Sequence, residues 1–172
     1  MESVDRVLEA VLRGHEPYPA WVVRQPFTFV RANAAAETLF PGLTQLSPGH
    51  LIDVWFGPGP FRDRVVNWSE VIQAGLTALR HAAADTGDAE VIRLLQRAEA
   101  HTQDRPVMSE ADVGASPVIC PVFELGGQIV RMISTVMRFE TAIEVTTSQL
   151  RIELMFPADD AAEAYFRAHG PT

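Results

Sequence analysis

Apolar side chains recur at three- and four-residue spacing near the start of the chain, which predicts an amphipathic helix over residues 3–13. Residues 21–24 and 27–32 are rich in aromatic and β-branched side chains, so they predict two short strands with a turn at Pro26 between them. Asn33 is a residue type that caps helices, and a short helix is expected after it. The chain is thus expected to begin as helix, strand, strand and helix.

Residues 43–63 show no regular period and contain a Pro-Gly pair and a Gly-Pro-Gly-Pro run, so they are predicted to be irregular. The segment is unusually apolar for a loop, and we expect its aromatic side chains to be buried. Long loops of this kind are often functional. The segment is therefore a candidate lid over a ligand pocket.

The middle of the chain is predicted to form two helices. Asn67 and Glu70 have the spacing of a capping box, in which each side chain satisfies an otherwise unpaired amide. Apolar residues then repeat at helical spacing as far as Leu79, and a Thr-Gly-Asp turn precedes a second helix. Helices joined by so short a turn are expected to pack antiparallel.

The last third of the chain changes to a period of two. Residues 118–125 and 128–139 flank a Gly-Gly pair, which predicts a hairpin because glycine adopts the positive φ angles of two-residue turns. Residues 150–156 alternate between apolar and other side chains and predict a third strand with one face buried. Asp160 and Glu163 predict a second capping box, for a terminal helix.

This order of elements predicts one α+β domain over residues 1–172, with a five-stranded antiparallel sheet and helices packed on one face. A composition with 47% hydrophobic residues is typical of a globular protein. No stretch approaches the roughly 18 consecutive apolar residues of a membrane span. The first residues lack the basic-then-apolar layout of a signal peptide, so we expect a cytoplasmic protein.

Charge and composition exclude several classes of function. The formal net charge is −8 and the basic residues are scattered, so direct nucleic-acid contact by this chain is not expected. Every basic residue is an arginine, which excludes Schiff-base lysines and the phosphate-binding P-loop lysine. The single cysteine, Cys120, excludes an internal disulfide framework.

The sequence offers no recognisable catalytic or metal site. The five histidines are widely separated and none has a metal-binding spacing such as H-E-x-x-H. Neither a G-x-S-x-G elbow nor a glycine-rich dinucleotide loop is present. Asp159 and Asp160 stand directly before a helix, which favours a capping role over paired catalytic carboxylates. We therefore predict no enzymatic activity, no metal and no cofactor.

Three segments carry a family resemblance. They are EPYPAWVV with FVRANAAAETL, FRDRVVNWSEVIQAGLTALRHAA, and VRMISTVMRFETAIEVTTSQLRIELMFPADDAA. The Asn-x-x-Ala turn at Asn33, the Asn-Trp helix start at Asn67 and the Phe-Pro-Ala-Asp element at 156–159 resemble the ligand-binding domain of MmyB-like transcription regulators. The chain has Glu140 and Glu144 where that family usually has glycine and aspartate, which affects a loop and not the fold.

The resemblance implies a PAS-like sensor fold in a bacterial cytoplasm. It implies a helix-turn-helix domain preceding this one, so DNA would be contacted by that domain, and we expect the chain to be part of a longer regulator. It also implies a small hydrophobic effector, because some relatives accommodate fatty acids, and a bound fatty acid is the one ligand expected. Such regulators usually read two half-sites, so a homodimer is expected.

The candidate ligand-binding residues are mainly aromatic and apolar, because ligand pockets are lined by such groups with a few polar anchors. Arginine and hydroxyl side chains among them are candidate partners for an effector carboxylate. Core packing is the alternative interpretation for each apolar member. The set comprises Trp21, Phe29, Trp55, Phe56, Arg64, Trp68, Ile72, Leu76, Arg80, Phe123, Met132, Ser134 and Met137.

Three hypotheses of function follow. In the first, the chain is an effector-sensing domain whose ligand shifts an attached DNA-binding domain through the helix at residues 3–13. In the second, it is a dimerisation module without a physiological ligand, which a dry and fully packed interior would favour. The third, a small enzyme or lipid carrier, requires converging ionisable groups in a cavity, for which the sequence offers no sign.

Overall fold

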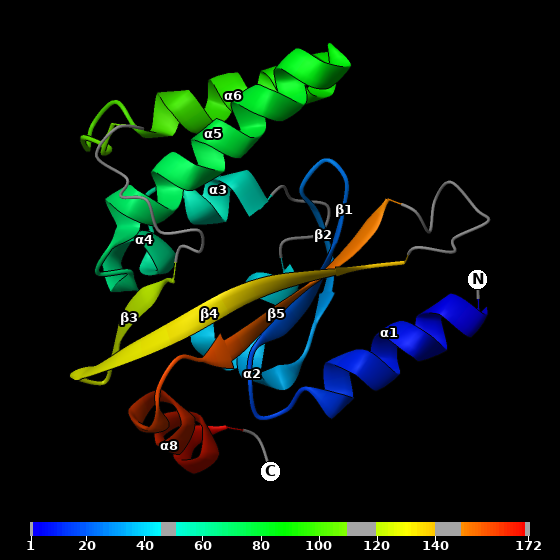
Figure 1. Cartoon of the computed structure of the whole chain (residues 1–172), viewed down its shortest axis with the longest axis vertical. Coiled ribbons are helices and arrows are strands. Elements are labelled where there is room, and N and C mark those ends of the chain that lie inside the picture. Colours follow the sequence, from blue (N-terminus) through cyan, green and yellow to red (C-terminus); the bar gives the residue numbers. More distant parts are fainter. Residues whose placement is uncertain (1, 46–50, 110–119, 140–148, 171–172) are drawn as a thin grey trace. The chain divides into compact units, whose positions relative to one another are not determined.

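The computed structural model describes residues 2–45, 51–109, 120–139 and 149–170 of the 172-residue chain. Its contacts divide the chain into two compact units, which are described separately: unit 1 comprises residues 1–50 and 130–172, and unit 2 comprises residues 51–129. The elements are shown in Figure 1. In chain order they are α1 (Glu2–Gly14), β1 (Ala20–Arg24), β2 (Thr28–Ala32), α2 (Ala34–Leu39), η1 (Leu43–Gln45), α3 (Leu51–Trp55), α4 (Pro60–Arg64), α5 (Trp68–Thr86), α6 (Ala89–His101), β3 (Val122–Leu125), β4 (Gln128–Arg138), β5 (Leu150–Pro157) and α8 (Asp160–His169).

The strands form one five-stranded sheet in the order β2-β1-β5-β4-β3. β1 pairs antiparallel with both β2 and β5, and β4 pairs antiparallel with β5. Gly126 and Gly127 have φ angles of +56° and +80°, as the predicted turn between β3 and β4 requires. The α+β class and the five-stranded antiparallel sheet are thereby confirmed.

In unit 1, α1 covers one face of the sheet, because its apolar stripe faces the strands. The shared core consists of Leu8, Leu12, Ala20, Val22, Leu150 and Ile152, all of them buried. Burying a leucine side chain stabilises a fold by roughly 1.5–3 kcal/mol. The helix predicted at residues 3–13 is therefore confirmed, and packing on the two central strands holds it in place.

Helical segments also reach the opposite face of the sheet. Side chains of neighbouring strand residues point to opposite faces, so Trp21 lies on the face away from α1. Its ring makes an edge contact with Phe40, at the end of α2, with 5.8 Å between the ring centroids. The residue that ends α2 therefore contacts the face of β1 that points away from α1.

Asn33 ties together the start of unit 1. Its side-chain oxygen accepts from the backbone N–H of Ala36 at 3.0 Å, which confirms the predicted helix cap, and from that of Ala20 at 2.9 Å. Its amide nitrogen donates to the carbonyl oxygens of Tyr18 at 2.8 Å and Leu12 at 3.3 Å. One buried side chain thus joins the end of α1, the start of β1 and the start of α2.

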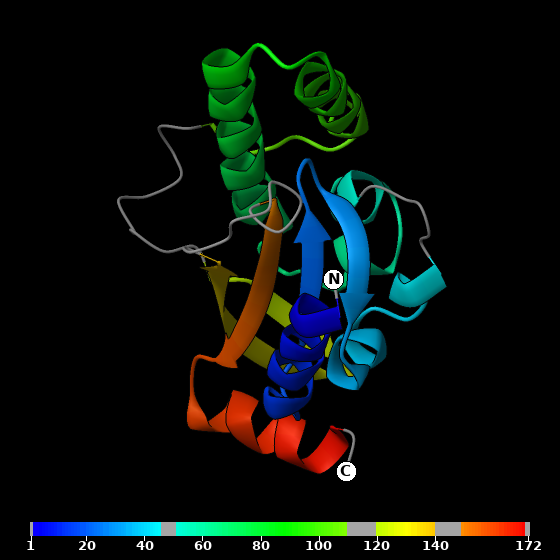
Figure 2. The same ribbon diagram turned by 90° about the vertical axis from the view of Figure 1, so that its right-hand side faces the viewer.

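The terminal helix α8 packs against the segment that joins α1 to β1, as Figure 2 shows. Phe166 makes an edge contact with Tyr18, with 6.1 Å between the ring centroids. The helix is capped by Asp159, whose side chain accepts from the backbone N–H of Ala162 at 2.8 Å. The predicted capping box began at Asp160, so it was wrong by one residue.

In unit 2, the segment predicted to be irregular is largely helical. Residues 43–45 form η1 in unit 1, and α3 and α4 follow in unit 2, while residues 46–50 lie outside the described part of the chain. Pro60 is compatible with a helix here because it occupies the first turn of α4, where its missing N–H has no helical partner in any case. Burial of Ile52 and Phe61 then stabilises these short helices.

The predicted α5 and α6 are present, but the capping box at the start of α5 is wrong. The Asn67 side chain makes no capping hydrogen bond. Its amide nitrogen donates instead to Glu70 Oε2 and to the Cys120 carbonyl, both at 3.0 Å. Its oxygen accepts from the Val122 N–H at 2.9 Å. Asn67 therefore links the start of α5 to β3. Its backbone partners are the Cys120 carbonyl, just before β3, and the N–H of Val122, the first residue of β3, and not an amide of its own helix.

Replacing Asn33 with alanine is expected to destabilise the chain by about 2–4 kcal/mol, because two amides and two carbonyls lose their partner. Urea denaturation followed by circular dichroism measures the loss. Asn33→Ser is the matched control, since serine retains the helix cap and should recover about 1 kcal/mol. An alanine variant as stable as the wild type would contradict this role.

Candidate functional site

The sheet face of unit 1 that points away from α1 combines charged and apolar side chains. The register places Trp21 opposite Glu153 and Val23 opposite Arg151 across β1 and β5. It places Val136 opposite Glu153 and Arg138 opposite Arg151 across β4 and β5. We call this surface the Trp21 face; it comprises Trp21, Val23, Gln25, Ser134, Val136, Arg138, Arg151, Glu153 and Met155.

Glu153 is the most perturbed acid of the Trp21 face. Its accessible surface makes it half-buried, but its carboxyl group is closely surrounded by protein, and this burial raises its pKa from the ordinary 4.5 to about 7. The Arg151 charge and a hydrogen bond from Trp21 oppose the rise without cancelling it. Glu153 therefore changes charge near neutral pH, which is unusual for a carboxyl group.

Arg151 lies between two charged neighbours and an amide. Burial lowers its pKa, the like charge of Arg138 lowers it further, and the charge of Glu153 raises it. The side-chain oxygen of Gln25, turned toward the guanidinium, accepts from Arg151 Nε at 2.7 Å and from Nη1 at 3.0 Å. Arg138 is exposed at the end of β4. The face thus carries two adjacent cations at one end.

The other end of the Trp21 face is mainly apolar. Met155 is buried, and its partner across the strands, Ser134, is half-buried. Met132, next on the same side of β4, is completely buried. Val136 lies between the two ends with 50% of its surface exposed. Polarity therefore changes along the strands, from paired arginines through Glu153 and Val136 to buried sulfur-containing side chains.

The remaining predicted residues of unit 1 divide between the two faces. Phe29 is buried opposite Val23, so it belongs to the same face as Trp21. Met137 packs against the α1 core instead. The odd spacing between Met132 and Met137 places them on opposite faces of β4. The structure therefore brings Trp21, Phe29, Met132 and Ser134 onto one face and leaves Met137 on the other.

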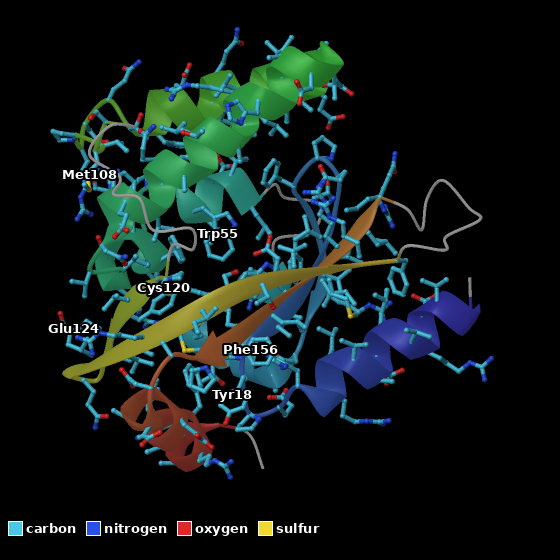
Figure 3. The ribbon with its side chains drawn as sticks, in the orientation of Figure 1. Tyr18, Trp55, Met108, Cys120, Glu124 and Phe156 are labelled. Carbon is cyan, nitrogen blue, oxygen red and sulfur yellow. The ribbon has the colours of Figure 1, made fainter. Side chains whose placement is uncertain are left out.

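In unit 2 the predicted aromatic residues form a packed cluster. The Trp55 ring contacts Phe61 with 4.3 Å between centroids, and Phe61 contacts Phe123 at 6.2 Å. Trp55 projects from α3, as Figure 3 shows. Phe56, Ile72 and Leu76 are buried as well. These positions have the burial expected of core residues, which was the alternative interpretation for each of them.

Trp68 has a structural environment of its own. Its side chain is completely buried, and its indole N–H donates to the Trp55 carbonyl at 3.1 Å. The guanidinium carbons of Arg62 and Arg105 lie 4.7 and 4.8 Å from its ring centre. Arg62 is itself buried and donates to Asp104 Oδ1 through both terminal nitrogens. Within unit 2, Trp68 therefore has a hydrogen-bond acceptor for its indole N–H and two arginine contacts with its ring.

The two arginines predicted as anchors for an effector carboxylate differ in their surroundings. Arg80 forms an exposed ion pair with Glu99 on α6, at 3.1 Å. Arg64 is half-buried at the end of α4. Arg80 is thus engaged with a carboxylate of its own chain. The paired arginines of the Trp21 face were not singled out from the sequence, although they lie beside several residues that were.

The family model for the MmyB-like transcription regulator ligand binding domain matches residues 4–168. The chain belongs to this family. The resemblance carried by the three sequence segments is thereby confirmed, and no curated protein matches the chain. An MmyB-like ligand-binding domain is a sensing part of a transcription regulator, and its family is regulatory rather than enzymatic.

The described residues of this MmyB-like domain contain neither a cluster of metal ligands nor a membrane-spanning helix. Among them, no group of three or more histidine, cysteine, aspartate or glutamate side chains is placed to hold a metal ion. No helix in the described ranges is long and apolar enough to cross a membrane. In unit 1, Glu153, Arg151 and Arg138 lie together on the Trp21 face.

The alternation of residues 150–156 was the sequence signal for Arg151 and Glu153, which were not among the predicted site residues. Residues 150–156 alternate, and the polar side of this strand was taken to face solvent. In the MmyB-like domain β5 pairs on both edges, with β1 and β4, and the side of Glu153 faces protein. The predicted buried face is confirmed at Leu150 and Ile152. It fails at the end of the strand, where Met155 is buried on the Trp21 face and Phe156 on the other face is 39% exposed.

Glu153→Gln is expected to change how stability depends on pH. A carboxyl group whose pKa is higher in the folded state binds its proton more tightly there, so its contribution is present below pH 4.5 and is lost as pH rises to about 7. The loss amounts to about 3 kcal/mol, and glutamine does not undergo it. Denaturation at pH 5 and pH 8 should show the variant gaining on the wild type at pH 8.

Glu9→Gln, on the exposed side of α1, is the control for loss of one negative charge. An equal gain for both variants would contradict the assignment to Glu153.

Trp68→Phe is expected to destabilise the chain by about 1–3 kcal/mol, because the Trp55 carbonyl loses its donor and the arginine contacts weaken. Trp55→Phe retains the accepting carbonyl and should cost less. Thermal unfolding compares the two variants. If Trp55→Phe were the more damaging change, the structural role given to Trp68 would be wrong.

Proposed function

We propose that this domain senses a small hydrophobic, fatty-acid-like effector, which binds along the Trp21 face and modulates an attached DNA-binding domain. The observation that carries the proposal is the change of polarity along that face, from Arg138 and Arg151 to Met155 and Met132. An amphiphilic molecule has the same order of groups. Membership in a family of ligand-binding domains supports a small-molecule ligand for this chain.

The exposure pattern supports binding at this face. Val136 has half of its surface exposed, and its neighbours on the same side of β4 are the half-buried Ser134 and the charged Arg138. Burial of an exposed apolar side chain by a ligand is favourable by about 25 cal/mol per Å². Ligand sites combine such apolar area with a small number of polar groups that fix orientation. Ser134 and Glu153 supply polar groups beside Val136.

The same strands connect the Trp21 face to α1, which is the proposed transmission element. Ala20 and Val22 contact the α1 core, while Trp21 and Val23 between them point to the other face. A ligand that favours one position of β1 would therefore favour one position of α1. It must bind one conformation more tightly than the other, since equal affinity shifts no equilibrium.

We further propose that the regulator acts in the bacterial cytoplasm as a homodimer. A dimer places two DNA-binding domains on two half-sites. In this arrangement α1 precedes the sensor and joins it to the DNA-binding domain, and the ion pair between Asp5 and Arg31 on β2, at 2.9 Å, helps to orient it.

The first experiment is native mass spectrometry of the purified chain, followed by solvent extraction of any bound molecule. After delipidation, titration with dodecanoic acid is followed by thermal shift and by Trp fluorescence. We expect saturable binding by the wild type and at least about tenfold weaker binding by Val136→Asp, which places a charge in the apolar contact. Val7→Asp on α1 is the matched control, because Val7 has a similar exposure of 46%.

Two results would contradict the proposal. Equal affinity of the two aspartate variants would exclude the Trp21 face as the site. A chain that carries no ligand and shows no shift with any fatty acid, but sediments as a stable dimer, would favour the dimerisation module.

A further inference from the structure

His15 directly follows α1 and links the end of that helix to β5. Its ring nitrogen Nε2 lies 2.9 Å from the Met155 carbonyl oxygen. A carbonyl oxygen only accepts hydrogen bonds, so Nε2 must be the donor. The backbone N–H of His15 donates to the Val11 carbonyl at 3.1 Å and so continues the hydrogen bonding of α1. The last turn of this helix is therefore tied to one strand of the sheet through the His15 ring.

Met155 connects this end of α1 to the Trp21 face. Its backbone N–H donates to the Pro19 carbonyl at 3.0 Å, and its own carbonyl accepts from His15. Both backbone groups thus bind the connector, residues 15–19, which joins α1 to β1. The Met155 side chain is buried on the Trp21 face, opposite Ser134 of β4. A change that moves this side chain would therefore reach the connector through a single residue.

The His15 ring also contacts two aromatic side chains, both labelled in Figure 3. Its centroid lies 4.8 Å from that of Phe156 and 5.9 Å from that of Tyr18, in edge arrangements. Phenylalanine can make ring contacts of this kind, whereas only a side chain with a donor can bind the Met155 carbonyl. Substitution can therefore separate the packing of the His15 ring from its hydrogen bond.

We propose that the hydrogen bond from His15 to Met155 couples the Trp21 face to α1, so that a ligand that displaces the Met155 side chain changes the stability of the last turn of α1. This inference rests on the proposed function and adds a residue to its regulation. The connection described there runs through β1, and this second one runs through β5. One hydrogen bond typically shifts an equilibrium by about two- to tenfold. That is a substantial part of the roughly 5–150-fold coupling that is typical between two sites.

The first test needs no ligand. Met155→Ala removes the side chain from the Trp21 face and keeps the backbone groups that bind the connector. Met132→Ala is the matched control, because Met132 is also buried on this face but belongs to β4 and pairs with Pro157. Hydrogen exchange of the amides of residues 12–15, followed by NMR, reports on the end of α1. We expect it to be about two- to tenfold faster in Met155→Ala than in Met132→Ala, and this difference to disappear when both changes are made in His15→Phe.

The replacement chosen at His15 distinguishes coupling from packing. His15→Gln loses the ring but places an amide donor near the position of Nε2, so it should retain most of the difference between the two methionine variants. His15→Phe keeps the ring and lacks the donor, so it should retain none. The opposite result, with the difference kept by phenylalanine and lost by glutamine, would overturn the hydrogen bond as the connection.

His81→Phe, at an exposed position of α5 in unit 2, is the control for the substitution itself and should leave the difference unchanged. If an alanine variant unfolds, Met155→Leu and Met132→Leu make the same comparison with a smaller change of shape.

The second test adds dodecanoic acid to the delipidated chain, with binding measured by Trp fluorescence in the same samples. In the wild type, saturation is expected to change exchange at residues 12–15 by about two- to tenfold, whereas His15→Phe should bind without this change. Binding by the wild type that leaves residues 12–15 unaffected would overturn the coupling and leave the proposed function intact. Absence of binding, with the ligand-free difference present, would overturn the effector class of the proposed function and leave the coupling supported.

Discussion

β1 and β5 run antiparallel through the middle of unit 1, and their pairing joins residues 20–24 to residues 150–154. The pairing closes the chain between Arg24 and Leu150 into one long loop, so it is formed at a high cost in chain entropy and must be stabilised by what it buries. On one side it buries the α1 core, with Ala20, Val22, Leu150 and Ile152. On the other it builds the Trp21 face. Every further feature of unit 1 depends on this register, because a shift by one residue would exchange the two faces.

The two faces have different physical characters. The α1 side is apolar throughout its core and behaves as an ordinary packed interior. The other side contains an acid with a pKa near 7 next to two adjacent arginines, an arrangement that costs stability in the absence of a ligand. Locally unfavourable contacts that the surrounding structure holds in place are typical of binding and switching sites. The two faces are one residue apart along β1, so under the proposed function a ligand on one face would influence the helix on the other.

In unit 2, several aromatic residues predicted to line a ligand pocket are buried, as core residues also are. Trp68, Phe56 and Phe123 are buried aromatic residues; Trp68 donates to the Trp55 carbonyl and Phe123 contacts Phe61. The buried Arg62 stacks on Trp68 and pairs with Asp104. Aromatic composition alone cannot separate these positions from Trp21, because both kinds are buried. The distinction comes from the neighbours: arginines already paired in unit 2, and adjacent like charges in unit 1.

The sequence by itself determined the elements whose signals are local. The apolar stripe of α1, the cap at Asn33 and the glycine pair after β3 each act within a few residues, so the pattern predicted them correctly. It also carried the family resemblance, which the match over residues 4–168 confirms. Tertiary structure alone decided that the Asn67 side chain bonds to the backbone of Cys120 and Val122 and does not cap its own helix. It also decided that the apolar residues between 51 and 64 form helices. It likewise decided that Arg138 meets Arg151, because that contact depends on long-range strand register, which no local pattern encodes.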